Sequence, residues 1–478
     1  QKVKKHVQPK GQKGEKHAKP INELFEKMRV QATPIEQRQK YMQQALESLL
    51  TNLESYVHSP TQARIIELIL KDGTQQQKDS IKEKLNPIIE SLLFSKYGRF
   101  VAVELMNFQR DKTVQPLIEQ YVLPISQKLM TNASSNIALN MIYSNASQQI
   151  QNMIINSIVA KHITEEADYL TKQVIQLPAT AQIYCQNVQK LLVHCESKMM
   201  LGSIVVICVL RQLFKIAFLD INQDIRTQVL KSMEFLQVIE AEQFLQLIDT
   251  LEGVEVACYV FAIQNAKQKK QIMQQIKFQL QKISEDKVAR LFLVFCGLFI
   301  DDTVLVQHVI TEFVQKINWN DKFYILIPLL FTSQLQRLHT EKKCVCMTDE
   351  MLKMVILNSF QINLCKKPIE KRQSELRTQI IGFLAEQKAE FFVDLLKVKG
   401  PFGELFGDIV NDLPKEVVIK VLQSSGDKQL LILEDVGHFN VKKAFKNMKT
   451  ELKSELKEFI GEIKGEGKRV EMLKEWVQ

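Results

Sequence analysis

Two short motifs in this sequence resemble catalytic sites, and neither has the arrangement that the chemistry needs. The segment GEIKGEGKR at 461–469 resembles a phosphate-binding loop, but its spacing is one residue too long, and Arg469 stands where a hydroxyl must bind magnesium. His194 and Cys195 could form a nucleophilic pair, but they lie within a helical run, where a buried and inert thiol is the default. We therefore expect no enzymatic activity.

A third group of residues has side chains that could bind zinc. It consists of His339, Cys344, Cys346 and Cys365. Their spacing matches no common zinc module, so we expect no metal and no other cofactor.

Positive charge is the remaining chemical feature of the chain. The 478 residues include 63 Lys and Arg against 54 Asp and Glu, a formal net charge of +9. Residues 1–19 carry seven Lys against Glu15 alone and show no apolar periodicity. We predict a basic, flexible arm over 1–34, although a solubility tail or a localisation signal would look the same. Its candidate phosphate-binding side chains are Lys2, Lys4, Lys5 and Lys10.

The elements that must position any further site are helices that recur along the chain. One helix position returns every 36 residues, in the pairs Ala63-Arg64, Arg99-Phe100 and Ser135-Asn136. The intervening chain also repeats, because residues 81–93 are echoed by residues 118–130, including Pro87 and Pro124. Such a period indicates stacked helical repeats, none of which can bury its apolar face alone.

Composition agrees with an all-α protein. Gly and Pro are few, at 16 and 12, and strand signals are scarce. We predict an all-α superhelix, or solenoid, with repeats over 35–336 and a further helical region over 337–478. The first three repeats are expected at about 59–94, 95–130 and 131–165. The period blurs between 166 and 250, where there is room for two or three more repeats.

No segment is predicted to cross a membrane. The most apolar window, at 201–219, is interrupted by Arg211 and Lys215, which favours a buried helix. The eight Cys are scattered through apolar helices rather than framed by loops, which is typical of a reducing intracellular compartment.

Several segments resemble one known family. The repeat segments 59–81, 95–106, 252–272 and 289–310 are similar to the repeats of the Puf-A family of divergent pumilio-homology proteins. Residues 366–396 and the closing helices resemble the extra C-terminal, CPL-type region of that family. The resemblance implies an L-shaped superhelix of pumilio-type repeats with N- and C-terminal arms. It also implies binding of structured nucleic acid without sequence preference, and work on large-subunit pre-ribosomes in the nucleolus.

The residues at the base-reading positions of ordinary pumilio repeats are unsuited to that task here. Each ordinary repeat reads one base through a five-residue window, whose first and fifth side chains contact the base edge and whose second side chain stacks. The windows here are Ala63/Arg64/Glu67, Arg99/Phe100/Val103, Ser135/Asn136/Leu139, Val254/Glu255/Cys258 and Ala289/Arg290/Leu293. Every window has an aliphatic residue or Cys at an edge position. A base-by-base code is therefore not expected.

Cations on the face expected to be concave could instead hold RNA through its phosphates. The candidate cations in the repeats are Arg64, Lys96, Arg99, Lys267, Lys269, Lys270 and Arg290, and Phe100, at a stacking position, is a candidate contact beside them. Each cation could equally be a solvated charge at a helix end.

Our main hypothesis is a non-catalytic scaffold that clamps pre-ribosomal RNA during large (60S) subunit assembly and pre-rRNA processing. It would contact other assembly factors and ribosomal proteins, and act as a monomer within a large ribonucleoprotein in the nucleolus or nucleus. No membrane and no small-molecule substrate are expected as partners. One alternative is a protein-binding solenoid of the HEAT or armadillo kind, and another is a sequence-specific pumilio repressor of messenger RNA.

Overall fold

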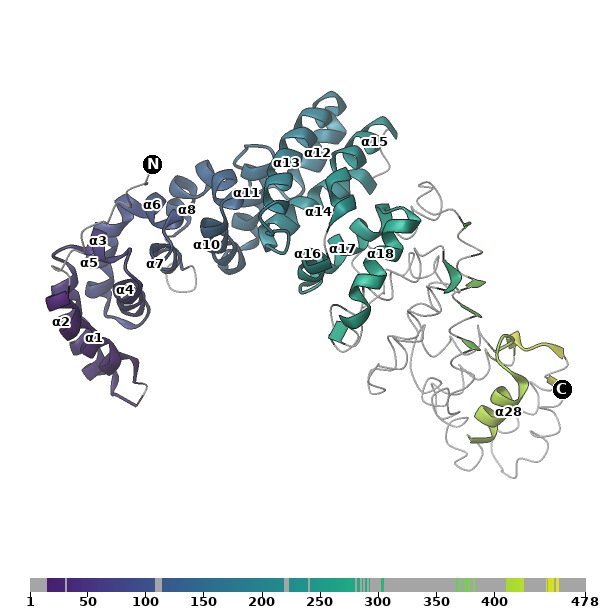
Figure 1. Cartoon of the computed structure of the whole chain (residues 1–478), viewed down its shortest axis with the longest axis horizontal. Helices are drawn as coiled ribbons and strands as arrows, with labels where there is room; N and C mark the ends of the chain where they lie inside the picture. Colours follow the sequence, from purple (N-terminus) through teal and green to yellow (C-terminus); the bar gives the residue numbers. More distant parts are fainter. Residues whose placement is uncertain are drawn as a thin grey trace, which may run out of the picture. The chain divides into compact units, whose positions relative to one another are not determined.

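The structure, a computed structural model, describes residues 15–30, 32–107, 114–218, 223–239, 241–279 and 410–424, with isolated residues elsewhere beyond 279. Every regular element among these residues is a helix, as Figure 1 shows, so the predicted all-α class is confirmed. None of the described helices is long and apolar enough to span a bilayer. The chain divides into two compact units, one of residues 1–216 and 221–232 and one of residues 217–220 and 233–478.

The first compact unit holds the clearest repeats. Its helices are α1 (Glu15–Arg29), α2 (Ile35–Leu49), α3 (Leu53–Tyr56), α4 (Pro60–Asp72), α5 (Gln75–Leu85), α6 (Ile89–Phe94), α7 (Gly98–Leu105), α8 (Gln115–Tyr121), α9 (Ser126–Thr131), α10 (Ala133–Asn145), α11 (Gln148–Val159), α12 (Tyr169–Gln176), α13 (Ala181–Glu196), most of α14 (Ile204–Phe218) and α15 (Gln223–Ser232). Short 3-10 turns η1 (Asn86–Ile88) and η3 (Leu123–Ile125) lie between them.

The sequence signals explain the helix boundaries within the first repeat. Gly73 ends α4, and a Cβ at this position would approach the carbonyl oxygen of Ile69 to 2.5 Å. Thr74 then caps α5, and its side chain and that of Gln77 form a reciprocal capping box. Pro87 lies in η1, where the helical chain is interrupted before α6.

The second repeat is built in the same way. Pro124 lies in η3, between α8 and α9, as Pro87 lies between α5 and α6. The repeated proline therefore divides the helical chain around it into two short helices in both repeats. This division accounts for the echo between residues 81–93 and residues 118–130.

One helix from each repeat packs against its counterpart in the next repeat. α4 packs on α7 and α7 on α10, and α14 continues the series beyond α10 (Figure 1). The last junction is fixed by two hydrogen bonds, from Ser203 Oγ to Asn140 Oδ1 (2.8 Å) and from the Tyr143 hydroxyl to Cys208 Sγ (3.3 Å). We call α4, α7, α10 and α14 the α4–α14 row.

The described residues of the blurred segment, where there is room for two or three repeats, contribute one further helix to this row. Between α10 and residue 250, the described residues place only α14 in the row. α13 precedes α14 as α6 precedes α7 and α9 precedes α10, but it has 16 residues where α6 and α9 have 6. The enlarged α13 and the added α12 lengthen the repeat, which explains why the 36-residue period disappears here.

The predicted flexible arm is wrong in its second half. Residues 15–29 form α1, which packs against α2 and buries Ile21 (4% exposed) and Met28 (0%). Apolar residues at this spacing lie on one helix face, so the polar composition concealed a short amphipathic helix. Lys2, Lys4, Lys5 and Lys10 lie outside the described residues.

The second compact unit contains α16 (Ala241–Leu247), α17 (Leu251–Ile263), α18 (Ala266–Ile276) and α28 (Lys415–Ser424) among its described helices. α16 packs closely on α17, because a Cβ at Gly253 would overlap the carbonyl oxygen of Leu247. The rings of Phe244 and Phe261 both contact Phe292, with centroids 5.0 and 5.5 Å apart. α17 is therefore a core helix, buried from Gly253 to Ala262.

Polar links near the C-terminus have the same sequence separation as those in the first compact unit. Arg377 pairs with Asp412, 35 residues away, and Asn411 Nδ2 donates to the carbonyl of Asn447, 36 residues away. These separations are those expected if the C-terminal region has helical repeats of similar length. The predicted boundary at 336/337 lies outside the described residues, and the implied L shape stays a prediction.

A half-buried ion pair joins the added helix α12 to the row. Asp168, just before α12, accepts hydrogen bonds from Lys215 Nζ (3.0 Å) and Gln212 Nε2 (3.1 Å) of α14. Burial raises the pKa of the Asp168 carboxyl, but Lys215, Gln212 and Arg211 more than offset this effect, so the pKa lies below its ordinary value.

We expect Asp168→Asn to lower the free energy of unfolding at pH 7 by about 1 kcal/mol, because a charge-assisted link is replaced by a neutral one. The pKa of Asp168 is lowered in the folded state. The contribution of its ionised carboxylate to stability is therefore complete above the unfolded pKa, about 3.9, and is lost as the pH falls through the folded pKa. The difference from wild type should therefore shrink below about pH 4. Urea denaturation from neutral to acidic pH measures it.

Asp249→Asn provides the matched control, because Asp249 is exposed. If the difference in free energy of unfolding between wild type and Asp168→Asn stayed constant down to acidic pH, the ion-pair explanation would be contradicted.

Candidate nucleic-acid interface

The first backbone bond of α4, α7 and α10, compared with that of α17, fixes the true register of the repeats. These N–H···O=C bonds join Ala63 to Ser59 (2.9 Å), Arg99 to Ser95 (3.4 Å), Asn136 to Asn132 (2.8 Å) and, in the second compact unit, Val254 to Thr250 (2.8 Å). Asn136, rather than Ser135, is thus equivalent to Arg99. The predicted window at Ser135/Asn136/Leu139 is one residue out of register, and its correct members are Asn136, Ile137 and Asn140.

The first side chain of each window faces the protein. Ala63 and Val254 are buried, at 4% and 0% exposure. Asn136 is also buried, and its Nδ2 donates to the carbonyl of Met130 (2.9 Å). None of these three side chains can reach the edge of a base.

The fifth side chain is also unavailable in the four windows whose fifth residue the structure describes. Val103 and Cys258 are buried. The Glu67 carboxylate accepts a hydrogen bond from Lys71 (2.6 Å). Asn140 Oδ1 accepts the hydroxyl of Ser203, which anchors α14 to α10. The groups that would read bases in these windows are therefore apolar, buried or committed to contacts within the protein.

In the windows of α4, α7 and α10, the second side chain is the one that reaches the surface of the row. Arg64 is exposed, Phe100 is half-buried and Ile137 is 41% exposed. The exception is Glu255 in α17, which is fully buried and accepts a hydrogen bond from the Tyr259 hydroxyl (2.9 Å). The α4–α14 row thus presents a cation, an aromatic ring and an aliphatic chain at equivalent positions of three successive helices.

Arg99 joins two helices of the row. Its Nη1 donates to the carbonyl oxygen (3.1 Å) and hydroxyl (2.7 Å) of Ser134, at the start of α10. Its guanidinium carbon also lies 4.8 Å from the centroid of the Phe100 ring. The side chain is half-buried, and its Nη1 group serves the junction between α7 and α10.

Arg64 and Lys96 are the predicted cations of the row that can still bind a ligand. Arg64 makes no hydrogen bond or ion pair with another residue of the described chain. Lys96 is exposed at the start of α7, and its ammonium lies 5.4 Å from the Tyr97 ring centroid.

The predicted cations of α18 differ from one another. Lys267 is exposed, and Lys270 is exposed with Asp302 at 3.7 Å. Lys269 is only 2% exposed, so its assignment to a binding surface is wrong. It lies on the same helix face as the buried Ile272, Met273 and Ile276, at spacings of three, four and seven residues. Arg290 lies outside the described residues.

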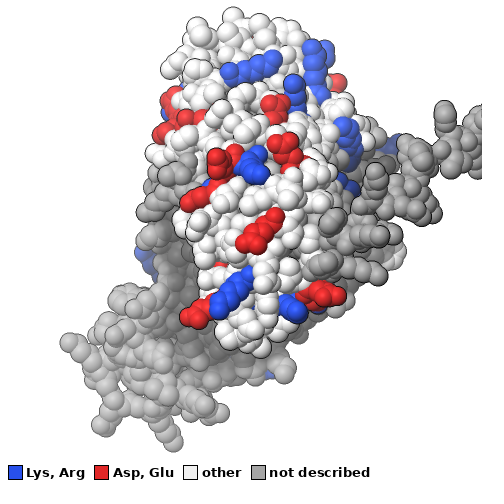
Figure 2. Space-filling view, turned by 90° about the vertical axis from the view of Figure 1, so that its left-hand side faces the viewer, with Lys and Arg blue, Asp and Glu red and all other residues white. Residues whose placement is uncertain are grey.

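Acidic side chains neutralise part of the charge of the row. Lys71 of α4 lies 2.6 Å from Glu67 and 3.9 Å from Glu104 of α7, and Arg38 of α2 lies 4.0 Å from Asp72. At the N-terminal end of the molecule, Lys and Arg are interspersed with Asp and Glu (Figure 2). The surface is therefore of mixed charge rather than a continuous basic stripe.

The structure also shows an exposed apolar pair that the sequence analysis missed. Ile137 and Met141 of α10 are 41% and 38% exposed, one helical turn apart. The signal that could have found them is Asn132, whose side chain accepts from the backbone N–H groups of Ser134 and Ser135 as the cap of α10. Counting the third repeat from this cap shifts its five-residue window by one residue and predicts that Ile137 lies at the surface.

Among the described residues, no three potential metal ligands lie together. His339, Cys344, Cys346 and Cys365 lie outside that part of the chain.

Comparison with solved structures identifies the fold. The crystal structure of human Puf-A superposes with a TM-score of 0.67 at 17% sequence identity, covering 95% of this chain and 98% of that one. The chain has the Puf-A fold. A crystal structure of human Puf-A in complex with DNA matches with a TM-score of 0.66, also at 17% identity and with the same coverage of the two chains.

Curated sequences point in the same direction as the Puf-A fold. Pumilio homolog 3 of Homo sapiens is 20% identical over 402 residues, which are 81% of this chain and 59% of that protein. Pumilio homology domain family member 6 of Saccharomyces cerevisiae is 21% identical over 391 residues, 77% of this chain and 58% of that protein. No protein-family model matches. The predicted resemblance to Puf-A is confirmed, and the chain spans less than two thirds of either curated relative.

We expect Arg99→Ala to lower the free energy of unfolding by about 1–3 kcal/mol, because it removes two hydrogen bonds to Ser134 and a stacked contact. Arg64→Ala removes the same charge from an exposed side chain and should change stability by less than about 0.5 kcal/mol. Urea denaturation at neutral pH compares the two variants. Equal effects would contradict the structural role of Arg99.

Proposed function

We propose that this protein binds folded RNA through its phosphate groups, without reading bases, and has no catalytic activity. The Puf-A fold supports nucleic-acid binding, since one crystal structure of human Puf-A is a complex with DNA. The main evidence for binding without base reading is that the side chains at the edge-reading positions are buried, apolar or already hydrogen-bonded. Ala63, Val103, Val254 and Cys258 are buried and apolar, and Asn136 is consumed by a backbone carbonyl. This loss also argues against a messenger-RNA repressor that recognises one base per repeat.

Phosphate binding needs cations at suitable separations rather than a match to base edges. Arg64 and Lys96 supply such cations at the beginnings of two successive row helices, and Lys267 supplies one in the second compact unit. Acidic side chains lie among the cations of α2, α4 and α7, so this surface has no continuous positive stripe. Each phosphate must therefore be bound by the individual cation nearest to it. Folded RNA provides fixed phosphate spacings, which suits isolated cations better than a flexible single strand does.

The biological setting is the finer part of the proposal. The resemblance to Puf-A supports a role on pre-ribosomal RNA in assembly of the large (60S) ribosomal subunit and in pre-rRNA processing. The protein would act as a monomer within a large ribonucleoprotein of the nucleolus or nucleus, and contact other assembly factors and ribosomal proteins. The Lys-rich start of the chain would add non-specific attraction to RNA.

We expect Arg64→Glu with Lys96→Glu to weaken binding of a fluorescein-labelled RNA hairpin about tenfold at low salt, whatever its sequence. The slope of log K against log salt should become less steep by about 0.7–0.9 for each phosphate that the variant no longer neutralises. Lys190→Glu with Lys231→Glu, a double charge reversal of the same size at exposed positions of α13 and α15, is the matched control. Unchanged affinity in the double variant would contradict the assignment of the RNA to this face.

A second candidate function is a protein-binding scaffold, which the exposed Ile137 and Met141 favour. Sedimentation of cell extracts with and without ribonuclease separates the two. The main proposal predicts that the protein migrates with large-subunit precursors and is released by ribonuclease and by Arg64→Glu with Lys96→Glu. Retention after ribonuclease, together with release by Ile137→Asp, would favour the scaffold.

A further inference from the structure

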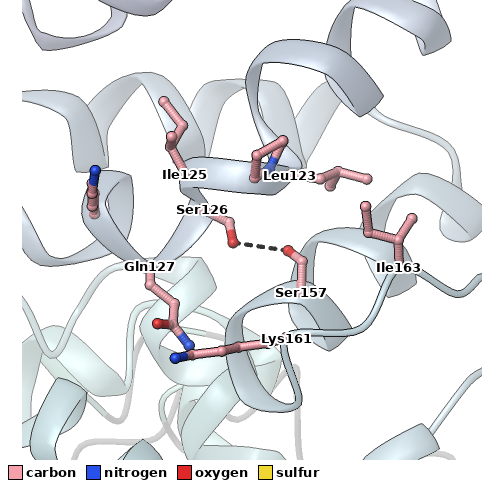
Figure 3. Close-up of a pocket in the computed structure, with 9 residues that line it drawn as sticks. Leu123, Ile125, Ser126, Gln127, Ser157, Lys161 and Ile163 are labelled. Carbon is pink, nitrogen blue, oxygen red and sulfur yellow. Dashed lines mark hydrogen bonds between the residues drawn. The ribbon is translucent and has the colours of Figure 1, made fainter.

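A pocket of about 300 Å³ lies between the segment 123–128 and the C-terminal end of α11 (Figure 3). It is lined by Leu123, Pro124, Ile125, Ser126, Gln127, Lys128, Ser157, Lys161 and Ile163. These residues come from η3, α9, α11 and the loop after α11, and none belongs to the α4–α14 row. The pocket is therefore separate from the proposed RNA surface.

The polar groups inside the pocket are satisfied within the protein. Ser157 Oγ lies 2.9 Å from Ser126 Oγ and 2.7 Å from the carbonyl oxygen of Ile154, and both serines are at most 5% exposed. Gln127 Nε2 donates to the carbonyl of Ile158 (2.6 Å). Because these groups need no polar ligand, the interior available to an occupant is mainly aliphatic. Ile163, which also lines the pocket, is 50% exposed.

Two lysines at the pocket are available to a ligand. Lys128 and Lys161 are exposed, and neither forms an ion pair with any residue in the described part of the chain. Lys161 follows the last turn of α11 in the left-handed region, with φ at 53°. Helices commonly end on a left-handed residue, but glycine adopts that conformation at lower cost than lysine.

The loop that carries Lys161 and Ile163 is held in place by α11. Asn156 Nδ2 donates to the carbonyls of Thr164 (2.9 Å) and Glu166 (2.8 Å). Asn152 Nδ2 donates to the carbonyl of Glu165 (3.0 Å). A fixed loop presents its side chains with little loss of conformational entropy on binding, which favours recognition of a ligand.

We propose that this pocket docks a short acidic peptide of a protein partner. One aliphatic side chain of the peptide enters beside Ile125 and Ile163, and its carboxylates face Lys128 and Lys161. An acidic peptide is the occupant that complements the charge of these two lysines and the aliphatic interior. The volume of the pocket suits one or two side chains. A nucleic-acid base is a poorer match, because no aromatic ring lines the pocket to stack on it.

The test uses the full chain and three fluorescein-labelled octapeptides. The first has one central Leu flanked by Asp and Glu, the second has the same Leu flanked by Lys, and the third has Gly in place of Leu between Asp and Glu. Fluorescence anisotropy should show saturable binding of the first peptide with Kd below about 1 mM, and much weaker binding of the other two. Lys128→Glu with Lys161→Glu should weaken the first peptide about tenfold. Lys40→Glu, an exposed reversal on α2, should leave its affinity unchanged.

Two further variants separate binding from folding. Lys161→Gly removes one charge at a position where glycine is less strained, so the unfolding midpoint should not fall while peptide affinity drops about threefold. Ile163→Asp changes a half-exposed side chain and should abolish the preference for Leu over Gly. Circular dichroism confirms that each variant keeps its helices.

Three results would overturn the proposal. These are absence of saturable binding by the acidic Leu peptide, equal binding by its Lys-flanked counterpart, and unchanged affinity in the double lysine variant. A loss of hairpin RNA binding in that variant beyond the loss in Lys190→Glu with Lys231→Glu, which changes the charge by the same amount, would assign the pocket to nucleic acid instead. The RNA proposal can fail without affecting these peptide measurements, because the two surfaces share no residue.

Discussion

The structure depends on each row helix burying its apolar face against the next. In α4, Ile65, Ile66 and Ile69 are completely buried, and no isolated 13-residue helix could achieve this burial in water. Polar contacts then fix how successive helices sit: Lys71 to Glu104, Arg99 to Ser134, and Asn140 to Ser203. Apolar burial stabilises the row, and these contacts determine its register.

The same contacts limit what the surface of the row can do. Edge-reading requires polar side chains that are available at fixed intervals, whereas here Asn136, Asn140 and Glu67 are bonded within the protein. The side chains that remain at the surface in equivalent positions are Arg64, Phe100 and Ile137, which differ in chemistry from one helix to the next. A surface of this kind can contact phosphates and apolar groups but has no repeated element with which to distinguish bases.

Much of the fold could be predicted from local signals. The break at Gly73 and Thr74 and the prolines at 87 and 124 define helix boundaries within the repeats, because capping and the missing proline N–H act within a few residues. The slip from 36 to 37 residues at Asn132 was missed because one added residue leaves the apolar pattern almost unchanged while shifting which side chain faces outward. Helix α1 was missed because lysines masked its two buried apolar positions.

The candidate site was harder to predict than the fold, because burial is a property of packing. Lys269 and Lys270 are neighbours of the same type, yet Lys269 is buried with the apolar face of α18 and Lys270 is exposed. Likewise, Arg64 and Arg99 both lie at the starts of row helices, but only Arg99 has Ser134 within reach. The pocket beside Lys128 and Lys161 joins residues more than 30 positions apart, so no local pattern indicates it.

The most direct measurement of the central claim is selection of RNA from a pool of hairpins whose loops are fully randomised, followed by sequencing of the bound fraction. Our account predicts that bound hairpins share a folded stem but no enriched loop sequence, and that all are released together as salt is raised. Enrichment of one short motif that stays bound at high salt would show that the protein reads bases, and would contradict the account.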